Sequence, residues 1–178
     1  MHDLSEAPAY VLTERLRLRF PEPADSGGLA TLADNPQIAA MTGTIPSPYE
    51  HVHAEAWIER VTQQRRCGET LAYVLCDKEH HALMGVMSLN HFQAQAANFA
   101  YWLGEPFWGH GFCTEAGRAM MSIAFDPLRL HALTAYYLQT NHASGRVLER
   151  LGFEFTEKKR LPHRGGHADF LCVERQSP

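Results

Sequence analysis

Residues 10–20 alternate between apolar and charged side chains, a period of two that predicts a β-strand with one buried and one solvated face. The alternating residues are Leu12, Leu16, Leu18 and Phe20 against Arg15, Arg17 and Arg19. We interpret the arginine row as the solvated face of this strand. Six further apolar runs predict strands over residues 71–76, 83–89, 97–103, 130–140, 153–158 and 168–174.

Apolar residues at helical spacing predict helices between these strands. The predicted helices cover residues 24–32, 48–66, 112–125 and 141–152, with a short additional helical piece that ends at Met41. Ser47 and Glu50 have the spacing of a capping box at the start of the second helix, and Pro127 ends the third. The residues expected to be buried by the second helix are Val52, Ala56 and Val61. Helical spacing places Ala116, Met120, Ile123 and Ala124 on one apolar face of the third helix.

The order of these elements is strand, two helices, three strands, helix, strand, helix and two strands, which indicates a mixed α/β (α+β) fold. The chain has 178 residues, 45% of them hydrophobic and 20% charged. This composition suits a single domain over residues 1–178 with one sizeable core. No repeat, low-complexity segment or linker divides it.

The formal net charge of −4 argues against a nucleic-acid-binding protein, which needs a basic face for the phosphate backbone. No apolar run approaches the ~18–20 residues that span a bilayer, so no membrane partner is expected. The first residues are polar and acidic rather than a signal peptide. The four cysteines contain no Cys-x-x-Cys pair. Reduced thiols and a cytoplasmic location are therefore expected.

The stretch from Tyr101 to Ala116 combines a strand, a glycine turn and a helix, which is an arrangement suited to binding phosphate. Gly109 and Gly111 allow the backbone to approach an anion closely, and the unpaired amides of the first helical turn point toward it. Thr114 stands where a dinucleotide-binding fingerprint requires its third glycine. The chain also lacks Gly-Lys-Ser and Gly-Lys-Thr, so neither common nucleotide-binding motif is complete.

Two other stretches accompany this loop. Residues 140–153 read Thr-Asn-His-Ala-Ser-Gly-Arg-Val-Leu-Glu-Arg-Leu-Gly-Phe, and residues 13–19 read Thr-Glu-Arg-Leu-Arg-Leu-Arg. Together with Trp-Gly-x-Gly-x-x-Thr-Glu-Ala at residues 108–116, they closely resemble the GNAT acetyltransferase superfamily, in its branch of RimJ/RimL-like ribosomal-protein-alanine N-acetyltransferases. The resemblance covers residues 10–175. It implies a mixed, mostly antiparallel sheet of about seven strands with helices on both faces.

The resemblance implies acetyl-CoA as the acyl donor, with its pyrophosphate held by backbone amides of the loop. The implied cofactor-binding residues are Trp108, Gly109, His110, Gly111, Phe112, Cys113 and Thr114 in the loop, Tyr101, Trp102 and Leu103 in the strand before it, and Asn141 and Ser144 further on. The strand would bind the pantetheine arm through free backbone groups, one of which would polarise the thioester carbonyl. For the loop, the alternative is a strand–helix turn with a purely structural role. For the Tyr101 and Trp102 side chains, the alternative is packing in the core.

Many members of the superfamily use a tyrosine to protonate the departing thiolate, and this chain has Leu148 at that position. The resemblance implies Ser144 as the substitute acid, in addition to its place at the cofactor. Asn141 is already explained as the N-cap of a short helix with Leu148 on its apolar face. Cys113 is electrostatically suited to a nucleophilic role at a helix N-terminus. However, the superfamily transfers the acyl group directly to the amine.

Asn98 occupies the position at which related sequences often have a glutamate general base, and asparagine cannot accept a proton. Glu105 is the nearby candidate for the catalytic base, with a solvated loop carboxylate as the alternative. An α-amino group has a pKa of ~7.7–8.0 and a lysine-type amine one of ~10.4, so a site without a strong base favours the first. The predicted acceptor is therefore a peptide or protein N-terminus or a small amine metabolite.

The eleven histidines include neighbouring pairs but no convincing third ligand, so no metal site is expected. Acetyl transfer from acetyl-CoA to a primary amine is the leading hypothesis. A non-catalytic acyl-CoA-binding module of the same fold is the first alternative, which the absence of both the tyrosine and the glutamate favours. A nucleotide-binding enzyme that uses the glycine turn is the second. A homodimer is compatible with the sequence.

Overall fold

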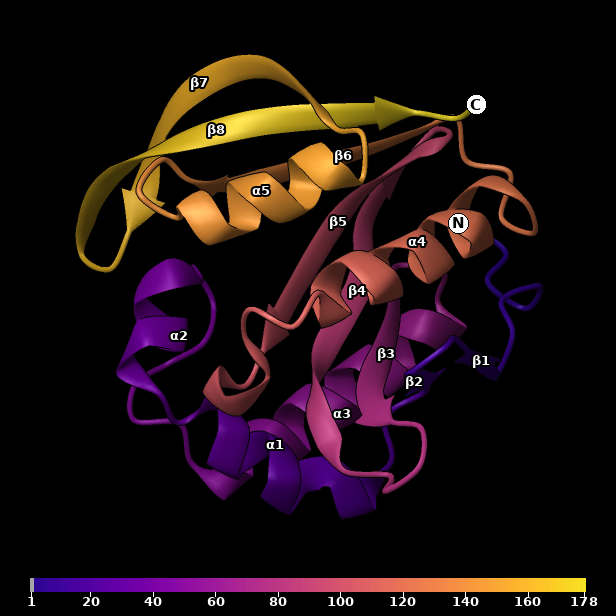
Figure 1. Cartoon of the computed structure of the whole chain (residues 1–178), viewed down its shortest axis with the longest axis vertical. Helices are drawn as coiled ribbons and strands as arrows, with labels where there is room; N and C mark the ends of the chain where they lie inside the picture. The colour runs from indigo at the N-terminus through magenta and orange to yellow at the C-terminus, as the bar shows by residue number, and fades with distance from the viewer. Residues whose placement is uncertain (1) are drawn as a thin grey trace.

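The computed structural model describes residues 2–178 and contains one sheet of eight strands in the order β1-β2-β3-β4-β5-β6-β8-β7 (Figure 1). The strands are β1 Tyr10–Leu12, β2 Leu16–Arg19, β3 Thr70–Asp77, β4 Leu83–Gln93, β5 Ala96–Leu103, β6 Ala132–Leu138, β7 Glu154–His163 and β8 Gly166–Gln176. Neighbouring strands are antiparallel except β5 and β6, which are parallel. The mixed, mostly antiparallel sheet expected from the sequence is confirmed.

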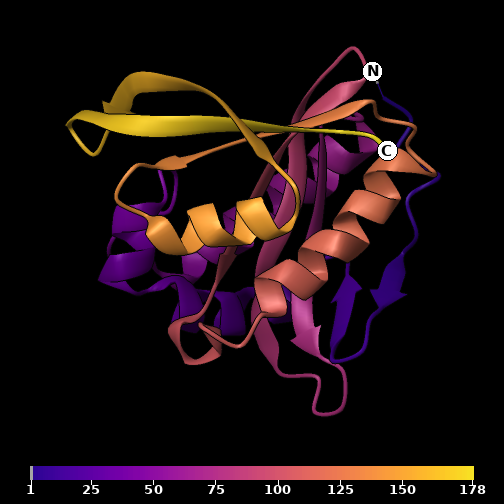
Figure 2. The same ribbon diagram turned by 45° about the horizontal axis from the view of Figure 1, so that its top comes forward.

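Helices lie on both faces of the sheet (Figure 2). They are α1 Ser26–Ala33, α2 Pro36–Met41, α3 His51–Arg66, α4 Phe112–Phe125 and α5 His142–Arg150, with short 3-10 turns η1 Pro23–Asp25 and η2 Glu105–Phe107. Helices α4 and α5 cover one face, and α1 and α3 cover the other. Helix α4 connects β5 to β6, which is the kind of crossover that a parallel pair requires.

Two apolar clusters, one on each face, hold these layers together. The larger cluster packs α4 and α5 onto the sheet, and α4 buries the four residues predicted from its helical spacing: Ala116, Met120, Ile123 and Ala124. The smaller cluster packs α1 and α3 onto the opposite face through Leu29, Ala54, Ile58, Val74, Cys76 and Val86. The centre of the sheet is therefore buried on both sides. This packing holds the central strands, and with them their ends, in fixed positions.

The predicted strand over residues 10–20 is two strands joined by a tight turn. The N–H of Thr13 donates to the carbonyl of Leu16 at 2.9 Å, and the N–H of Leu16 donates to the Thr13 hydroxyl at 2.9 Å. Leu16 is fully buried, whereas Leu12 is 53% exposed on the edge strand. The apolar and charged positions keep their period of two through the turn, so the alternation alone did not reveal the turn. The sheet therefore has eight strands rather than the expected seven.

Helix α3 begins at His51, later than predicted, because Glu50 rather than the predicted serine is its N-cap. The N–H of Glu50 donates to Nδ1 of His53 at 2.9 Å, which completes the cap. The residues that α3 buries are Ala54, Ile58 and Val61. Val52 and Ala56, which were predicted to be buried, are exposed, because the stripe that starts at Ala54 faces the sheet. No helix within residues 2–178 is long and apolar enough to cross a membrane.

Candidate active site

A large cleft opens where β5 and β6 stop pairing. Residues 96–98 pair with residues 132–134, and the two strands diverge beyond that point (Figure 1). At the last paired position the side-chain amide of Asn98 donates to the carbonyl of Thr134 at 3.3 Å. The cleft has a volume of about 1930 Å³, whereas a pocket for one small ligand has roughly 300–1,000 Å³. It therefore has room for two reactants.

The cleft passes through the sheet. Six residues of the glycine loop and the start of α4, together with α5, line it on one face, and α2 and α3 line it on the other. The predicted site residues that line it are Tyr101, Trp102, Leu103, Trp108, Gly109, Gly111, Phe112, Cys113, Thr114, Asn141 and Ser144. His110 and Glu105 are the predicted site residues that do not line the cleft.

The edge of β5 that borders the cleft offers backbone groups for hydrogen bonding. Along a strand, successive residues direct their N–H and C=O groups to opposite sides. The N–H of Gly104 donates to a β4 carbonyl at 2.8 Å, so the backbone of Trp102 also faces β4, and Tyr101 and Leu103 face the cleft. The carbonyl of Leu103 accepts from the indole N–H of Trp108 at 2.8 Å. Within the described residues, the N–H groups of Tyr101 and Leu103 have no strand partner.

The glycine loop presents uncapped amides at the start of α4. Gly109 and Gly111 have φ angles of +78° and +82°, a left-handed region that favours glycine. Gly111 is the N-cap of α4, and no side chain caps the first helical turn. The hydroxyl oxygen of Thr114 is buried and has no hydrogen-bond partner within residues 2–178. An uncapped helix N-terminus beside a buried, unpaired hydroxyl fits a bound phosphate.

Arg15, in the turn between β1 and β2, anchors this loop. Its Nε donates to Oε2 of Glu115 at 2.7 Å, and its Nη1 donates to the carbonyl of His110 at 3.0 Å. The guanidinium also lies 4.5 Å from the ring centre of Phe112. The carbonyl of His110 and the N–H of Gly111 belong to one trans peptide and point in opposite directions. Because Arg15 binds the carbonyl of His110, the N–H of Gly111 points away from the guanidinium of Arg15.

Glu115 holds Arg15 in this position. Burial tends to raise the pKa of Glu115, but hydrogen bonds from the Thr13 hydroxyl and from the backbone and side chain of Arg15 outweigh it and hold the pKa below its ordinary value. The Thr13 hydroxyl donates to Oε1 at 2.6 Å, and the N–H of Arg15 donates to the same oxygen at 2.8 Å. Glu115 is therefore ionised at neutral pH and fixes the β1–β2 turn against α4.

The interpretation of the arginine row as a solvated face is only partly correct, because Arg15 is exposed whereas Arg17 and Arg19 are half-buried. Arg15 is bound to Glu115, and Arg19 pairs with Asp25 at 2.6 Å, with the Asp25 side chain only 8% exposed.

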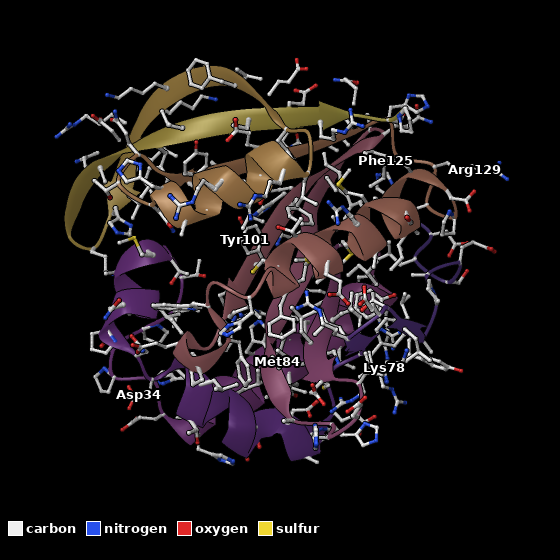
Figure 3. All side chains as sticks on the ribbon, in the orientation of Figure 1. Asp34, Lys78, Met84, Tyr101, Phe125 and Arg129 are labelled. Atoms are coloured by element: carbon white, nitrogen blue, oxygen red, sulfur yellow. The ribbon has the colours of Figure 1, made fainter. Side chains whose placement is uncertain are left out.

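Tyr101 and Ser144 meet across the cleft, one from β5 and one from α5. Their hydroxyl oxygens lie 2.8 Å apart, and the Tyr101 hydroxyl also donates to the Ser144 carbonyl at 3.2 Å. Tyr101 lies on β5 between α4 and α5 (Figure 3). Burial raises the pKa of Tyr101 more than the Ser144 hydrogen bond lowers it, so the phenol stays protonated at neutral pH. The pair therefore holds two hydroxyl protons in the cleft.

Asn141 caps α5 as predicted, since its Oδ1 accepts from the N–H of Ser144 at 3.1 Å. This bond fixes the first turn of α5 and with it the position of the Ser144 hydroxyl. Leu148, at the position of the superfamily's tyrosine, is buried in the larger apolar cluster. No phenol comes from that position, and Tyr101 supplies one from the opposite wall.

Glu105 lies in η2, where its Oε2 accepts a hydrogen bond from the side-chain amide of Asn35 at 2.6 Å. This bond ties the carboxylate to the break between α1 and α2, outside the cleft. The placement gives no support to its predicted role as the general base. It agrees with the alternative of a loop carboxylate.

Burial raises the pKa of the Cys113 thiol to about 12. The thiol is protonated at neutral pH, which agrees with the expectation that Cys113 is not a nucleophile. All four cysteines are free thiols. Within residues 2–178, no three histidine, cysteine, aspartate or glutamate side chains are grouped in a way that could hold a metal ion.

A second group of cleft residues, on the α2–α3 face, was not identified from the sequence. It includes Ile38, Met41, Ile45, Tyr49, Trp57 and Arg60. The tip of the β7–β8 hairpin closes this end against α2 (Figure 1). Nε2 of His163 donates to the carbonyl of Ala40 at 3.0 Å. Arg164 donates to the carbonyls of Ala39 and Ile45. These residues come from elements far apart in the sequence, so no local pattern marks them.

Comparison with known proteins places this architecture in context. The sequence model of the acetyltransferase (GNAT) domain matches residues 15–154. The uncharacterised N-acetyltransferase p20 of Bacillus licheniformis is 26% identical over 145 residues, which are 80% of this chain and 80% of that protein. The ribosomal protein uS5-alanine N-acetyltransferase of Escherichia coli (strain K12) is 25% identical over 172 residues, which are 92% of this chain and 84% of that protein.

Solved structures share the fold. Mycobacterium smegmatis RimJ in complex with CoA-disulfide superimposes with a TM-score of 0.88 at 18% identity, covering 99% of this chain and 90% of that chain. RimL, a ribosomal L7/L12 alpha-N-protein acetyltransferase, in complex with coenzyme A gives a TM-score of 0.85 at 18% identity, covering 96% of this chain and 97% of that chain. At these identities the likeness establishes a common fold.

Proposed function

Because this chain belongs to the acetyltransferase (GNAT) family, we propose that it transfers an acetyl group from acetyl-CoA directly to an α-amino group. The observation that carries the proposal is the continuous cleft through the sheet, which joins the glycine loop before α4 on one face to residues of α2 and α3 on the other. A donor and an acceptor that enter from opposite faces would meet at the divergence of β5 and β6.

The chain's own groups suit each part of acetyl-CoA. The amides at the start of α4, with the Thr114 hydroxyl, would hold the pyrophosphate. The cleft edge of β5 would bind the pantetheine arm, and the N–H of Tyr101 or Leu103 would polarise the thioester carbonyl as negative charge develops on its oxygen. Acetyl-CoA supplies the activated acyl group, and the protein supplies its orientation.

Ser144 is the residue that we assign to the leaving sulfur. As the amine nitrogen forms its bond to the acetyl carbon, the C–S bond breaks and the sulfur needs a proton. The Ser144 hydroxyl can donate it and can recover a proton through Tyr101, whose oxygen lies 2.8 Å away. This pair replaces the tyrosine that other superfamily members carry at the position of Leu148.

The proton that the acceptor amine loses is expected to leave through water. Asn98 is an amide that already donates to Thr134, and Glu105 is turned toward Asn35. His53 lines the acceptor side, but its Nδ1 already accepts the backbone N–H of Glu50, so in the neutral ring Nε2 carries the hydrogen. A site of this kind favours an amine of low pKa, such as the α-amino group of a peptide, of which roughly a tenth is neutral at pH 7.

Release of the free CoA thiol from acetyl-CoA, measured against a panel of amines and peptides, tests the proposal. We expect amine-dependent release and an acetylated product detectable by mass. The relative named for acetylation of alanine on ribosomal protein uS5 supports including peptides that begin with alanine. Binding of acetyl-CoA without release by any amine would instead indicate the non-catalytic acyl-CoA-binding module. A thermal shift with NAD or ATP but not with acetyl-CoA would indicate a nucleotide-binding enzyme.

Ser144→Ala is expected to lower kcat by about 100-fold, the contribution typical of a general acid, while the Kd for acetyl-CoA changes little. The reason is that negative charge on the sulfur exists only as the reaction proceeds. The kcat is measured by steady-state kinetics with saturating acceptor, and the Kd by titration calorimetry with acetyl-CoA in the absence of acceptor. The matched control is Ser122→Ala, an exposed serine on α4. An unchanged kcat in Ser144→Ala would remove this residue from the mechanism.

Glu115→Gln is expected to raise the Kd for acetyl-CoA by about tenfold, because it releases Arg15 and with it the orientation of the Gly111 amide. The variant keeps the positive charge of Arg15 at the loop. If Arg15 acted only by direct attraction to phosphate, affinity would therefore stay the same or rise. Glu149→Gln, an exposed residue on α5 with the same change of charge, is the control. Titration calorimetry at two salt concentrations separates the two outcomes.

A further inference from the structure

The acceptor half of the cleft has an uncharged floor. On the face toward α3, the register places Val86 beside Trp102, Ser88 beside Ala100, and Asn90 beside Asn98. These side chains share one face because strand residues alternate. The floor thus changes from apolar to neutral polar toward the divergence of β5 and β6, and the amide of Asn90 donates to the Ser88 hydroxyl at 3.2 Å. It carries no carboxylate that could form an ion pair with a second ammonium group.

The walls of this half are apolar and aromatic, with one formal charge. Among the described cleft residues between positions 36 and 64, Arg60 is the only one that carries a full charge at neutral pH. Tyr49 and Arg60 both line the cleft, where burial raises the pKa of Tyr49 and the positive charge of Arg60 opposes that rise. Trp57 precedes Arg60 on the same helical stripe of α3. An arginine beside aromatic rings suits a ligand that is part apolar and part anionic.

The guanidinium of Arg60 is available. It takes part in no ion pair or side-chain hydrogen bond within residues 2–178, so its five N–H donors face the cleft or water. Arg15 and Arg19, by contrast, are bound to carboxylates of the protein. His53, which carries its ring hydrogen on Nε2, lines the same half and adds one more donor.

With one exception, the acidic residues that give the chain its net charge of −4 are not among the described residues that line this cleft. The exception is Glu69, which directly precedes β3, two strands away from β5. A polyamine or an aminoglycoside carries several ammonium groups and would need several carboxylates in the walls. The charges of this site are therefore opposite to those that a polycationic acceptor requires.

Resting on the proposed function, we infer that the acceptor is a small amine that also carries a carboxylate and an apolar side chain, such as an α-amino acid or a short peptide. The carboxylate is bound by Arg60, and the apolar side chain packs against Trp57, Tyr49 and Met41. A planar guanidinium can bind both carboxylate oxygens at once, which also fixes the direction of the amine.

The test compares each acceptor with its own C-terminal amide at pH 7: leucine with leucine amide, and alanyl-leucine with alanyl-leucine amide. The parent enzyme is expected to have a kcat/KM about 10-fold to 100-fold higher for the acids, mainly through KM. In leucine amide the amine is less basic, so the amine chemistry alone would favour the amide. Arg60→Gln should remove the preference for the acids. Arg66→Gln, an exposed arginine near the end of the same helix and outside the cleft lining, should keep it.

The outcomes distinguish a failure of the carboxylate inference from a failure of the proposed acetyl transfer. Equal kcat/KM for acids and amides in the parent, or a preference that survives in Arg60→Gln, overturns the carboxylate inference while acetyl transfer itself stands. A higher kcat/KM for spermidine than for any of the acids also overturns it. If no amine of any class releases the CoA thiol although acetyl-CoA binds, the proposed function fails first. The KM for acetyl-CoA, which Arg60→Gln should leave unchanged, shows that the variant is folded.

Discussion

Replacement of Gly111 by valine is expected to raise the Kd for acetyl-CoA on the order of 100-fold while the fold persists. Gly111 has a φ angle of +82°, which a β-branched residue adopts only under strain of ~1–3 kcal/mol. The nearest atom to an added Cβ is Nη2 of Arg15 at 3.7 Å, an ordinary contact. The effect therefore comes from the backbone, because relief of the strain rotates the amide that Arg15 holds in place.

Titration calorimetry with acetyl-CoA measures the effect, and Gly165→Val is the matched control. Gly165 lies in the turn between β7 and β8 with a φ angle of +80°, and an added Cβ would meet nothing within 4 Å. Both variants carry the same backbone strain and should lose thermal stability to a similar extent. Only Gly111→Val should lose affinity. Equal affinities of the parent and Gly111→Val would remove the loop from the acetyl-CoA site.

The elements that the sequence predicted correctly are those in which local chemistry and packing agree. The four apolar residues of α4 recur at helical spacing because one face of that helix packs on the sheet. Asn141 caps α5 by a bond to Ser144, only three residues away. The two glycines before α4 have the positive φ angles that the loop requires. Such features are encoded within a few residues, and the sequence alone suffices for them.

The features that the sequence did not reveal depend on contacts between distant segments. The carboxylate of Glu115 meets Arg15 from 100 residues away, and an arginine in an alternating strand gives no sign of its partner. The acceptor half is assembled from α2, α3 and the tip of the β7–β8 hairpin. Glu105 was a reasonable candidate by its place in the chain, but its direction is decided by Asn35 across the fold.

A peptide with a free α-amino group is expected to be acetylated far faster at pH 7 than its N-blocked, lysine-containing counterpart. The pKa values of the two amines, ~7.7–8.0 and ~10.4, differ by roughly 2.4 units, which corresponds to about 3.3 kcal/mol of additional deprotonation cost for lysine. The cleft offers no free carboxylate beside the divergence of β5 and β6 to offset that cost, since Asn98 is an amide there. The ratio of kcat/KM should therefore reach about 100-fold.

The measurement uses saturating acetyl-CoA and two peptides of equal length with free C-terminal carboxylates, so that binding of the carboxylate does not distinguish them. The pH profile provides a second readout. If water takes the proton, kcat/KM for the α-amino peptide should rise with pH and level off above the pKa of its amine near ~8, whereas for the lysine peptide it should still rise at pH 9. A plateau at lower pH for both peptides, or a preference for the lysine peptide, would contradict this account. Either result would indicate a general base that serves the cleft directly or through water, in place of simple transfer of the proton to solvent.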